Sequence, residues 1–521
     1  MITSTIFKLT GIDKYERLTI GLCLLVFLIL VFISPYHEMG GYGVETDFYG
    51  SYALKAKAIL SGEHIQWEDH GPGYIFILAL FNLIFNDIFT AGKFITIVST
   101  VLFGFFTFKV LSVLFKPRLA FFTVLLLLIN ILPYSILVSN DMFFAFVVAL
   151  SIYLIYRKGQ ISYLNLFWGG LVAGYAYMTR MNAVILPMAV IFSTIFINPE
   201  RWNWPERVKA IAIFCLSFLI GTSPWLIMNI TTYGTPFVSR AHETIGASIL
   251  SSETATGDFA WDMEKEVISK KYHSITTLIF SNFSEFVIFF TKNIRSYFEW
   301  MLIALLRFPA YLFLAPGAVL LFSRINRKQL SYFTIAVFGF LIYCILVFMP
   351  RFYIYILPFF LFLVVYFLFY EKIANDDKSF AVKFSLLTKS IFIVTVILLS
   401  ISSIEALKKN ITTEPLELKK ISQLLRAKSK ESDIMIARKP HLAYLSNMKV
   451  VVFPDVDSIE KLIDYAKEKK AAYLLYSDIE AKTRPRLKIL QEPDKVPSNL
   501  QVFYYQDKPK IIVYKILNYS H

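Results

Sequence analysis

Long apolar runs alternate with short polar segments along the chain as far as residue 406. A run of about 20 apolar residues can cross a bilayer as an α-helix. The first run, 18–34, follows Lys8, Lys14 and Arg17 and has no small-residue cleavage site, so we interpret it as an uncleaved helix. The other runs lie at 91–115, 119–138, 141–157, 162–179, 183–198, 208–229, 300–322, 331–349, 352–370 and 388–406. The pattern therefore predicts about eleven transmembrane helices.

The apolar segment 74–88 is shorter and is interrupted by Asn82, Asn86 and Asp87. We interpret it as a helix on or dipping into the outer leaflet, because this choice puts the basic loops on one side. Lys and Arg concentrate in cytoplasmic loops, so that side is predicted to be cytoplasmic. The N-terminus is then cytoplasmic and the C-terminal tail extracytoplasmic. The loops in question are 116–118, 157–158, 200–209, 324–328 and 371–378.

Two long segments fall on the outer side in this arrangement, 36–90 and 230–299. A connection as long as 230–299 is typical of a lid or a binding element. Its second part, from Phe283 to Trp300, mixes charged residues with aromatic ones and reads as an interfacial helix. Chemistry, if the protein performs any, is expected on this outer side.

Beyond the last apolar run the chain has the pattern of a soluble domain. Helical periodicity covers 414–429 and 458–469, and the strand-like segments are 433–437, 449–453, 471–476, 501–505 and 510–516. This alternation predicts a small α/β domain with some parallel pairing. We therefore expect a polytopic α-helical membrane domain over residues 1–406, with loops 36–90 and 230–299 forming an active site. An extracytoplasmic α/β domain is expected over 407–521.

Composition agrees with a membrane protein. Of the 521 residues, 56% are hydrophobic and 17% are charged, with a mean hydropathy of +0.57. The net charge of +14 fits basic cytoplasmic loops and anionic lipid, and we expect no nucleic acid partner. All three cysteines, Cys23, Cys215 and Cys344, lie in apolar runs. The exported parts are therefore predicted to have no disulfides, and the cysteines show no metal-ligand spacing.

The acidic pair Glu45 and Asp47 begins the first outer segment, next to the bilayer. An ionised carboxylate there could take a proton from an acceptor hydroxyl. Asp47 could equally well cap the helix predicted to follow it, because Asp is a favoured N-cap residue. Glu45 is the rival base. The two carboxylates could also hold a divalent cation through oxygen ligands, although two side chains supply few of the ligands that such a cation needs.

Other polar residues interrupt the apolar pattern at the outer ends of spans. Asn140 and Asp141 form a turn between two runs, for which a tight turn with a helix cap is the simpler interpretation. Arg180 and Arg351 lie at outer span ends, where snorkelling and phosphate binding are equally good explanations. Arg307 lies within an apolar run, where a functional role is favoured because an unpaired charge there is costly.

Three further residues of the outer segments are candidates for contacts with an acceptor: His70, Tyr74 and His242. The histidines show no metal spacing, and an ordinary polar contact is the simpler role for each. Tyr74 follows a Gly71-Pro72-Gly73 turn.

Several of these segments together resemble the GT-C membrane glycosyltransferases. The resemblance covers roughly residues 10–370 and is strongest toward protein O-mannosyltransferases and the aminoarabinose transferases that act on lipid A. No single motif is specific. The resemblance rests on the order of the motifs along the chain and on their predicted location on the same side of the membrane. The segments are Thr46-Asp47-Phe48-Tyr49 with Ala53, Ala56 and Ser61-Gly62, then Gly71-Pro72-Gly73-Tyr74, Asn140-Asp141, Thr179-Arg180, Pro224-Trp225-Leu226-Ile227-Met228-Asn229 and Pro350-Arg351-Phe352-Tyr353 with Pro358.

The resemblance implies a GT-C fold and transfer of a sugar from a polyprenyl-phosphate donor to a hydroxyl of a glycan, lipid or protein. Transfer would take place at the outer face with inversion at the anomeric carbon. Asp47 matches the catalytic carboxylate of the family, and Asn140-Asp141 matches its second acidic loop, although Asn140 departs from a paired acid. Arg180 and Arg351 would lie near the lipid phosphate. We expect the protein to be an integral protein of a bacterial inner membrane.

A transporter or flippase of lipid-linked saccharides is the competing class. Such a protein should carry ionisable residues deep in several spans and show repeat symmetry. In this chain the charges gather at span ends and no repeat is visible. The pattern favours the enzyme.

Overall fold

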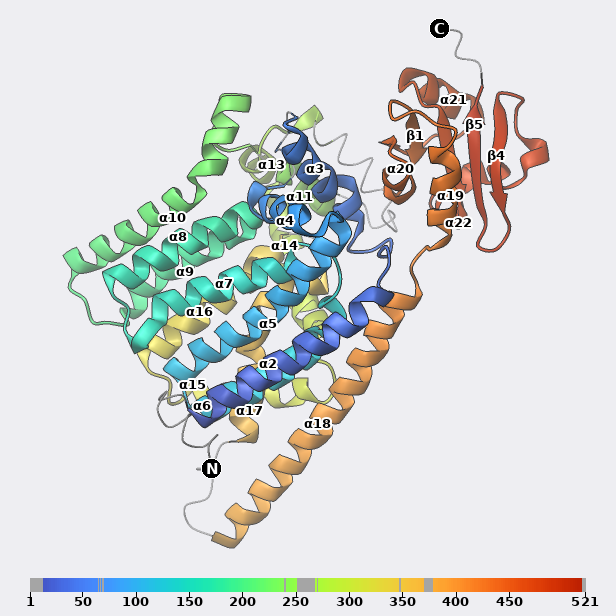
Figure 1. Cartoon of the computed structure of the whole chain (residues 1–521). Helices are drawn as coiled ribbons and strands as arrows, with labels where there is room; N and C mark the ends of the chain where they lie inside the picture. Colours follow the sequence, from blue (N-terminus) through green and yellow to red (C-terminus); the bar gives the residue numbers. More distant parts are fainter. Residues whose placement is uncertain are drawn as a thin grey trace. The chain divides into compact units, whose positions relative to one another are not determined.

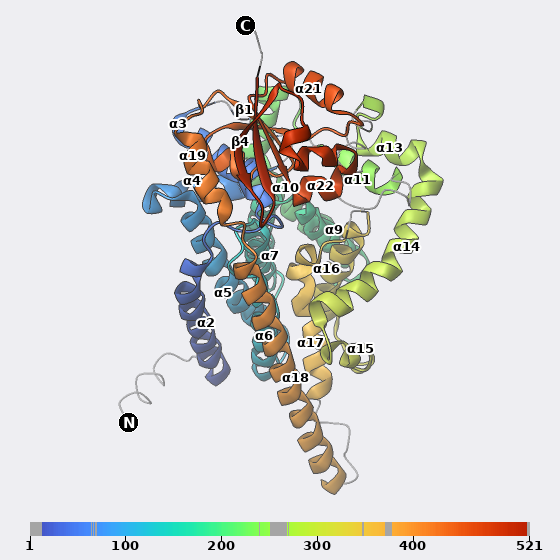
Figure 2. The same ribbon diagram turned by 90° about the vertical axis from the view of Figure 1, so that its right-hand side faces the viewer.

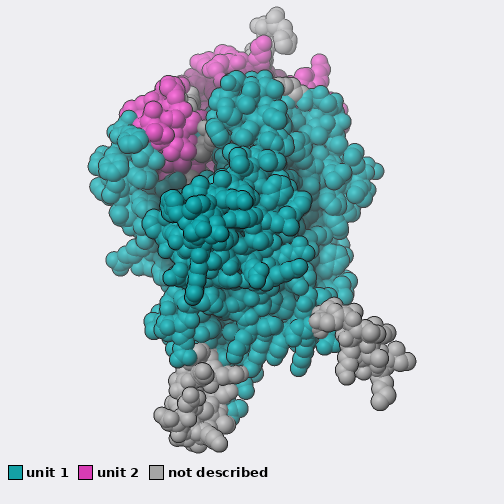
Figure 3. All heavy atoms as spheres, turned by 90° about the vertical axis from the view of Figure 1, so that its left-hand side faces the viewer, with its two compact units in different colours: residues 1–37, 55–241, 279–412 teal, residues 38–54, 242–278, 413–521 magenta. Residues whose placement is uncertain are grey.

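The computed structural model describes residues 13–63, 65, 67, 70–238, 240–250, 268, 270–345, 348–369 and 378–517. It forms two compact units, coloured separately in Figure 3. The first contains residues 1–37, 55–241 and 279–412, and the second contains 38–54, 242–278 and 413–521. The second unit thus includes two stretches that the sequence analysis assigned to the membrane domain. Residues 251–267, at the centre of the predicted lid, lie outside the described part.

The first unit is a bundle of helices (Figure 1). The polar breaks between apolar runs separate most of them, as at Lys116-Pro117 between α5 and α6. Its helices are α2 (Lys14–Ile33), α4 (Pro72–Phe85), α5 (Ile88–Leu114), α6 (Pro117–Ile131), α7 (Asp141–Tyr156), α8 (Tyr163–Thr179), α9 (Ile185–Phe192), α10 (Trp204–Tyr233), α14 (Phe283–Met301), α15 (Leu314–Phe322), α16 (Arg327–Tyr343), α17 (Leu357–Leu368) and α18 (Lys378–Thr412). Helices α3 (Ala53–Ser61) and α13 (Ile275–Ser281) have residues in both units.

The predicted helical membrane architecture is confirmed, but some of the predicted spans are shorter than expected or are bent. Among the described residues, seven helices are long and apolar enough to cross a membrane, built on α2, α5, α6, α7, α10, α17 and α18. The other four predicted spans are shorter or bent. Helices α8 and α16 have 17 residues each, and 181–197 is a further short apolar helix. Segment 74–88, predicted not to cross, forms α4, which has 14 residues.

The fourth exception is a bent pair. The helix that covers 283–306 and the one that covers 310–322 meet at an angle of 120° (Figure 2). Pro309 cannot donate a backbone hydrogen bond, and it disfavours helical geometry in the residue before it. The helix ends at Arg307, whose φ of 56° is unusual for a residue with a side chain. The predicted span at 300–322 is therefore broken, and α14 matches the amphipathic helix predicted at 283–300.

The loops at the end of the unit that was predicted to be cytoplasmic contact one another. Lys328 forms a salt bridge of 3.0 Å with Glu200 and donates to the carbonyl of Gly159 at 2.9 Å. Glu200 also accepts from the backbone N–H of Ile161 at 2.8 Å. Three loops that the charge argument placed on one side thus meet at one end of the bundle. The orientation of that end in the cell stays a prediction.

Glycines let α8 and α10 pack closely. A Cβ on Gly174 would lie 2.2 Å from the carbonyl oxygen of Phe218, and one on Gly221 would lie 2.2 Å from that of Leu171. Small residues permit such backbone contact between membrane helices. The close pairing fixes α8, whose last residue, Thr179, directly precedes Arg180.

The second unit is built around the C-terminal sheet. The strands are β1 (Ile434–Ala437), β2 (Lys449–Val452), β3 (Tyr473–Ser477), β4 (Leu500–Gln506) and β5 (Ile511–Ile516), in the order β2-β1-β3-β5-β4. Strand β1 is parallel to β2 and β3, whereas β5 is antiparallel to β3 and β4. The predicted α/β domain with some parallel pairing is confirmed. The helices of this unit are α11 (Ala241–Leu250), α19 (Glu417–Arg426), α20 (His441–Leu445), α21 (Ile459–Glu468) and α22 (Asp478–Thr483).

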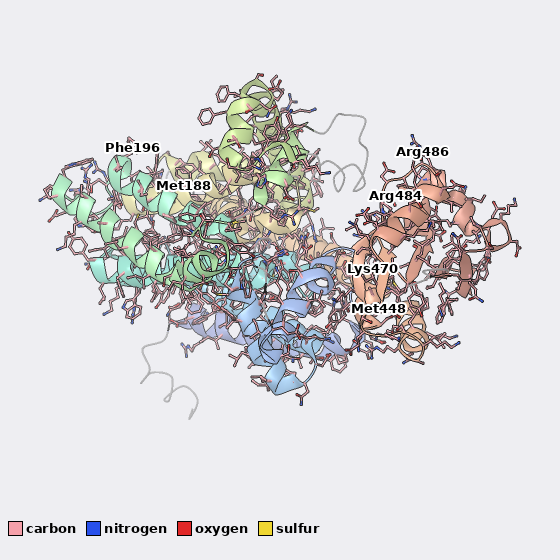
Figure 4. The ribbon with its side chains drawn as sticks, turned by 90° about the horizontal axis from the view of Figure 1, so that it is seen from above. Met188, Phe196, Met448, Lys470, Arg484 and Arg486 are labelled. Atoms are coloured by element: carbon pink, nitrogen blue, oxygen red, sulfur yellow. The ribbon has the colours of Figure 1, made fainter. Side chains whose placement is uncertain are left out.

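Each face of the sheet is covered by a hydrophobic cluster. One contains Phe453, Leu462 and Tyr476, and beside it the buried Arg484 donates to the carbonyls of Phe453 and Pro454 at 2.9 Å each (Figure 4). The other includes Met448 of the tail and also Met39, which precedes the acidic pair by only a few residues and is 1% exposed. Met39 of the first outer segment is therefore part of the core of the C-terminal domain.

Candidate functional site

Asp141 is the centre of a buried polar cluster in the first unit. It is the first residue of α7 and is 4% exposed. Ser139 donates from its hydroxyl to Oδ2 of Asp141 at 2.9 Å, and the partial positive charge of a helix N-terminus favours a carboxylate there. The turn is therefore more than the helix cap of the simpler interpretation, because its carboxylate also contacts two arginines.

Arg180 and Arg351 reach this carboxylate from different parts of the chain. Arg180 follows α8 in extended backbone and contacts Oδ1 of Asp141 through Nη1. Arg351, in the short helix Pro350–Ile356, lies with Nη1 3.5 Å from Oδ2. Asn140 accepts from Nη1 of Arg180 at 3.2 Å and donates to the carbonyl of Thr179 at 3.3 Å. Three turns that were predicted to share one face thus meet at one carboxylate.

Aromatic residues cover the two guanidinium groups. The guanidinium carbon of Arg180 lies 4.4 Å from the ring centre of Phe352, and that of Arg351 lies 5.3 Å from it. Both arginine side chains are 15% exposed. Cation–π contacts of this kind strengthen when water is excluded. Snorkelling to the interface, the alternative explanation, does not account for two arginines that turn inward to one carboxylate.

The Gly71-Pro72-Gly73 turn packs directly on the end of α8. A Cβ on Gly71 would lie 2.1 Å from the carbonyl oxygen of Met178, and a Cβ on Gly73 would lie 2.9 Å from the backbone nitrogen of Thr179. Tyr175 donates to the carbonyl of Gly73 at 2.8 Å. The turn therefore supports the backbone immediately before Arg180. Sequence reasoning found this turn but not its contact with α8.

The first unit also contains three other candidates: His70, Tyr74 and Arg307. Tyr74 is buried on α4, with its ring 6.1 Å from that of Phe143. His70 is half-buried in the turn before α4. Arg307 donates to the hydroxyl of Ser403 at 2.8 Å. Arg307 is therefore paired within the bundle, as its place in an apolar run requires.

Asp47 and Glu45 belong to the second unit. Asp47 stands at the N-cap position of the helical turn Phe48–Tyr52, yet its side chain makes no capping hydrogen bond. It is half-buried, whereas Glu45 is 1% exposed and packs against Gly40. The side chain of Asp47 is thus the more accessible of the two. Its role as a base stays a prediction.

His441, which sequence reasoning missed, holds the segment before Asp47. It is fully buried at the start of α20, and its Nε2 lies 3.0 Å from the carbonyl oxygen of Gly41. Its ring centre is 4.9 Å from that of Tyr42 and 4.6 Å from that of Tyr49. Nothing in the tail sequence marks this histidine, because its partners lie about four hundred residues earlier in the chain.

Because His441 is buried in its neutral form, the folded state is expected to lose stability at acidic pH. Burial lowers the pKa of His441 to about 4, with a smaller lowering by Lys439, whereas the bond to Gly41 raises it. The unfolded chain then binds a proton below pH 6.5 that the folded chain does not bind until about pH 4. The free energy of unfolding should therefore be highest above pH 6.5 and fall by about 3 kcal/mol as the pH is lowered toward 4.

Thermal unfolding between pH 7 and pH 4 tests this expectation. Tyr42, Tyr49 and Lys439 also face His441, and surface carboxylates add a background to the pH dependence of stability. The matched control is therefore His441→Gln, which should lose less stability on acidification than the unchanged protein. Equal losses in both proteins would contradict the assignment.

The described residues contain no group of three or more His, Cys, Asp or Glu side chains that could hold a metal ion. The divalent cation predicted for Glu45 and Asp47 stays a prediction. His242 is half-buried on α11 of the second unit, and its role as an acceptor contact also stays a prediction.

Comparison with known sequences gives one family match. Residues 69–228, which run from the turn before α4 to α10, match the family described as dolichyl-phosphate-mannose-protein mannosyltransferase. This region contains Asn140, Asp141 and Arg180. A comparison with curated protein sequences finds no match.

Solved structures match over nearly the whole chain. A crystal structure of ArnT from Cupriavidus metallidurans bound to undecaprenyl phosphate has a TM-score of 0.61 at 12% identity, and the match covers 96% of this chain and 98% of that one. The oligosaccharyltransferase AglB of Archaeoglobus fulgidus, in complex with an inhibitory peptide and a dolichol-phosphate, has a TM-score of 0.60 at 13% identity. That match covers 98% of this chain and 75% of the other. The chain therefore has the fold of the GT-C membrane glycosyltransferases.

Proposed function

We propose that this protein is a membrane glycosyltransferase that moves a sugar from a polyprenyl-phosphate donor to an acceptor hydroxyl at the extracytoplasmic face. The observation that carries the proposal is the convergence of Arg180 and Arg351 on Asp141 within a GT-C fold. Two of the solved structures of this fold hold a polyprenyl phosphate, undecaprenyl phosphate in one and dolichol-phosphate in the other.

The chemistry of the cluster suits a phosphate leaving group. A guanidinium is planar and always charged, and the fork of its N–H donors matches the geometry of phosphate oxygens. Asp141 would hold the two arginines close together, which their mutual repulsion alone would prevent. Fixed cations at the position where negative charge develops on the departing phosphate lower the barrier to transfer.

The remaining step needs one base. We assign it to Asp47, which would take the proton of the acceptor hydroxyl as the oxygen attacks the anomeric carbon. Direct displacement by the acceptor inverts that carbon and needs no covalent intermediate. The sugar and the acceptor, a glycan, lipid or protein, would be selected by residues outside the arginine cluster.

Binding of the lipid phosphate tests the proposal without requiring the acceptor. Arg180→Gln and Arg351→Gln should each weaken binding of polyprenyl phosphate about 10- to 100-fold, the equivalent of one or two charge-assisted hydrogen bonds. The matched control is Arg295→Gln, because Arg295 is 85% exposed and pairs with Glu299 on the surface of α14. Binding to purified protein in nanodiscs can be followed by isothermal titration. Equal affinity in the two cluster variants and the control would contradict the proposal.

A further inference from the structure

Several residues of the C-terminal tail contact the segment that carries Asp47. Upstream of Asp47, Oε2 of Glu414 accepts from the backbone N–H groups of Glu38 and Met39 at 2.9 and 3.0 Å. The side chain of Met39 then enters the hydrophobic core of the tail domain. Lys419 adds a salt bridge of 2.6 Å to Glu38. The beginning of the segment is thus fixed by α19 and the residues just before it.

The middle of the segment is fixed by α20 and the residues before it. Lys439 lies 3.4 Å from the hydroxyl of Thr46, the residue next to Asp47. His441 bonds to the carbonyl of Gly41, as described above. These contacts reach the chain on the N-terminal side of Asp47.

Contacts on the C-terminal side of Asp47 come from the same part of the tail. The ring of Tyr49 packs against those of His441 and Tyr444, with ring centres 4.6 and 5.1 Å apart. The Tyr49 hydroxyl donates back to the carbonyl of Met39 and so closes the segment on itself. Asp47 therefore lies at the start of the helical turn Phe48–Tyr52, and residues before and after it in the sequence contact α20.

We infer that the C-terminal domain positions Asp47 for catalysis, with His441 as the central positioning residue. The inference rests on the proposed function of Asp47 as a base. His441 contacts no reacting atom in this account and acts through Gly41, Tyr42 and Tyr49. It is suited to the task because one neutral ring can donate to a carbonyl and pack against two aromatic rings at once. The tail domain thereby gains a part in the reaction.

The bond to Gly41 also fixes the form of the histidine. For Nε2 to donate to a carbonyl the ring must carry its proton there, and Nδ1 has no hydrogen-bond partner among the described residues. A second proton on Nδ1 would be buried without an acceptor, which is costly. The neutral ring is thus the form that holds the segment.

Two measurements on the full-length protein test the inference together. Hydrogen–deuterium exchange of peptides from 38–52 reports whether the segment is held, and steady-state kinetics with a polyprenyl-phosphate sugar report whether holding it matters for the reaction. His441→Ala should speed exchange in this segment and lower kcat about 10- to 100-fold with the donor KM unchanged, since small misplacements of a catalytic group have effects of this size. His441→Gln, whose amide can still donate to Gly41, should restore part of both.

Two further variants keep the test decisive if His441→Ala folds poorly. Glu414→Ala removes the bonds to Glu38 and Met39 while His441 stays, so faster exchange should concentrate at the start of the segment. Lys461→Ala is the control, because Lys461 lies on the exposed face of α21 and pairs only with Asp457 among the contacts seen. It should change neither exchange nor kcat.

The outcomes separate the inference from the proposed function. Unchanged exchange in both His441→Ala and Glu414→Ala would overturn the anchoring, and faster exchange with an unchanged kcat would show that anchoring does not serve catalysis. Full transfer activity in Asp47→Asn would instead show that Asp47 is not the base. Positioning of Asp47 by the tail could then not serve catalysis, whatever the exchange data show.

Discussion

Asp47→Asn is expected to lower kcat for sugar transfer by about 10²- to 10⁴-fold, the usual contribution of a general base. The amide has nearly the shape of the carboxylate but cannot accept the proton of the acceptor hydroxyl. The substitution keeps the size and shape of the side chain at the N-cap position of helix Phe48–Tyr52, so we expect the free energy of unfolding to stay nearly unchanged. Loss of activity would then be a chemical effect and not a folding effect.

The matched variant for this prediction is Glu45→Gln. Glu45 is 1% exposed and packs against Gly40, so it is poorly placed to reach a substrate. It should keep most of the transfer activity. The measurement is transfer of labelled sugar by purified protein, with thermal unfolding of each variant alongside. The reverse ranking, with Asp47→Asn active and Glu45→Gln inactive, would move the base to Glu45.

Asp141→Ala is expected to be the most disruptive change in the first unit. It removes the shared partner of Arg180 and Arg351 and leaves two guanidinium groups close together with 15% of each side chain exposed. Removing one partner of a buried ion pair typically costs about 3–5 kcal/mol. Thermal unfolding in detergent should show this loss, and binding of polyprenyl phosphate should weaken because the arginines are no longer held at one place.

Glu299→Ala is the comparison for that variant. It breaks an ion pair of similar chemistry in which Arg295 is 85% and Glu299 is 55% exposed, and exposed pairs contribute only about 0–1 kcal/mol. A large difference between Asp141→Ala and Glu299→Ala is therefore expected. Similar losses in the two variants would mean that Asp141 is not the element that holds the cluster together.

The sequence predicted the parts of this protein that depend on local pattern. Apolar runs located the helices of the first unit, and alternation after residue 410 located all five strands of the tail. Charge asymmetry grouped the turns at Asp141, Arg180 and Arg351 on one face, and the structure brings these three side chains together. Knowing which span ends share one face of the membrane thus reduced the number of candidate site residues, even though no single motif was specific.

The pattern of apolar and polar residues could not predict contacts between segments that lie far apart in the sequence. The pairing of Met39 with the tail core and the bond from His441 to Gly41 join residues about four hundred positions apart. The approach of Gly71 to Met178 likewise depends on how two helices meet. The break at Arg307 was missed for another reason: Pro309 was visible in the sequence, but the apolar run on both sides of it reads as continuous.

Acceptor-dependent release of polyprenyl phosphate is the most direct measurement of the central claim. Purified protein in sealed proteoliposomes would receive a labelled polyprenyl-phosphate sugar and a mixture of envelope acceptors, and free polyprenyl phosphate and labelled product would be quantified together with movement of the lipid between leaflets. The account predicts release of polyprenyl phosphate in equal amount to labelled product, and neither with Asp47→Asn. Movement of the intact lipid-linked sugar between leaflets, without release, would contradict it and favour a flippase.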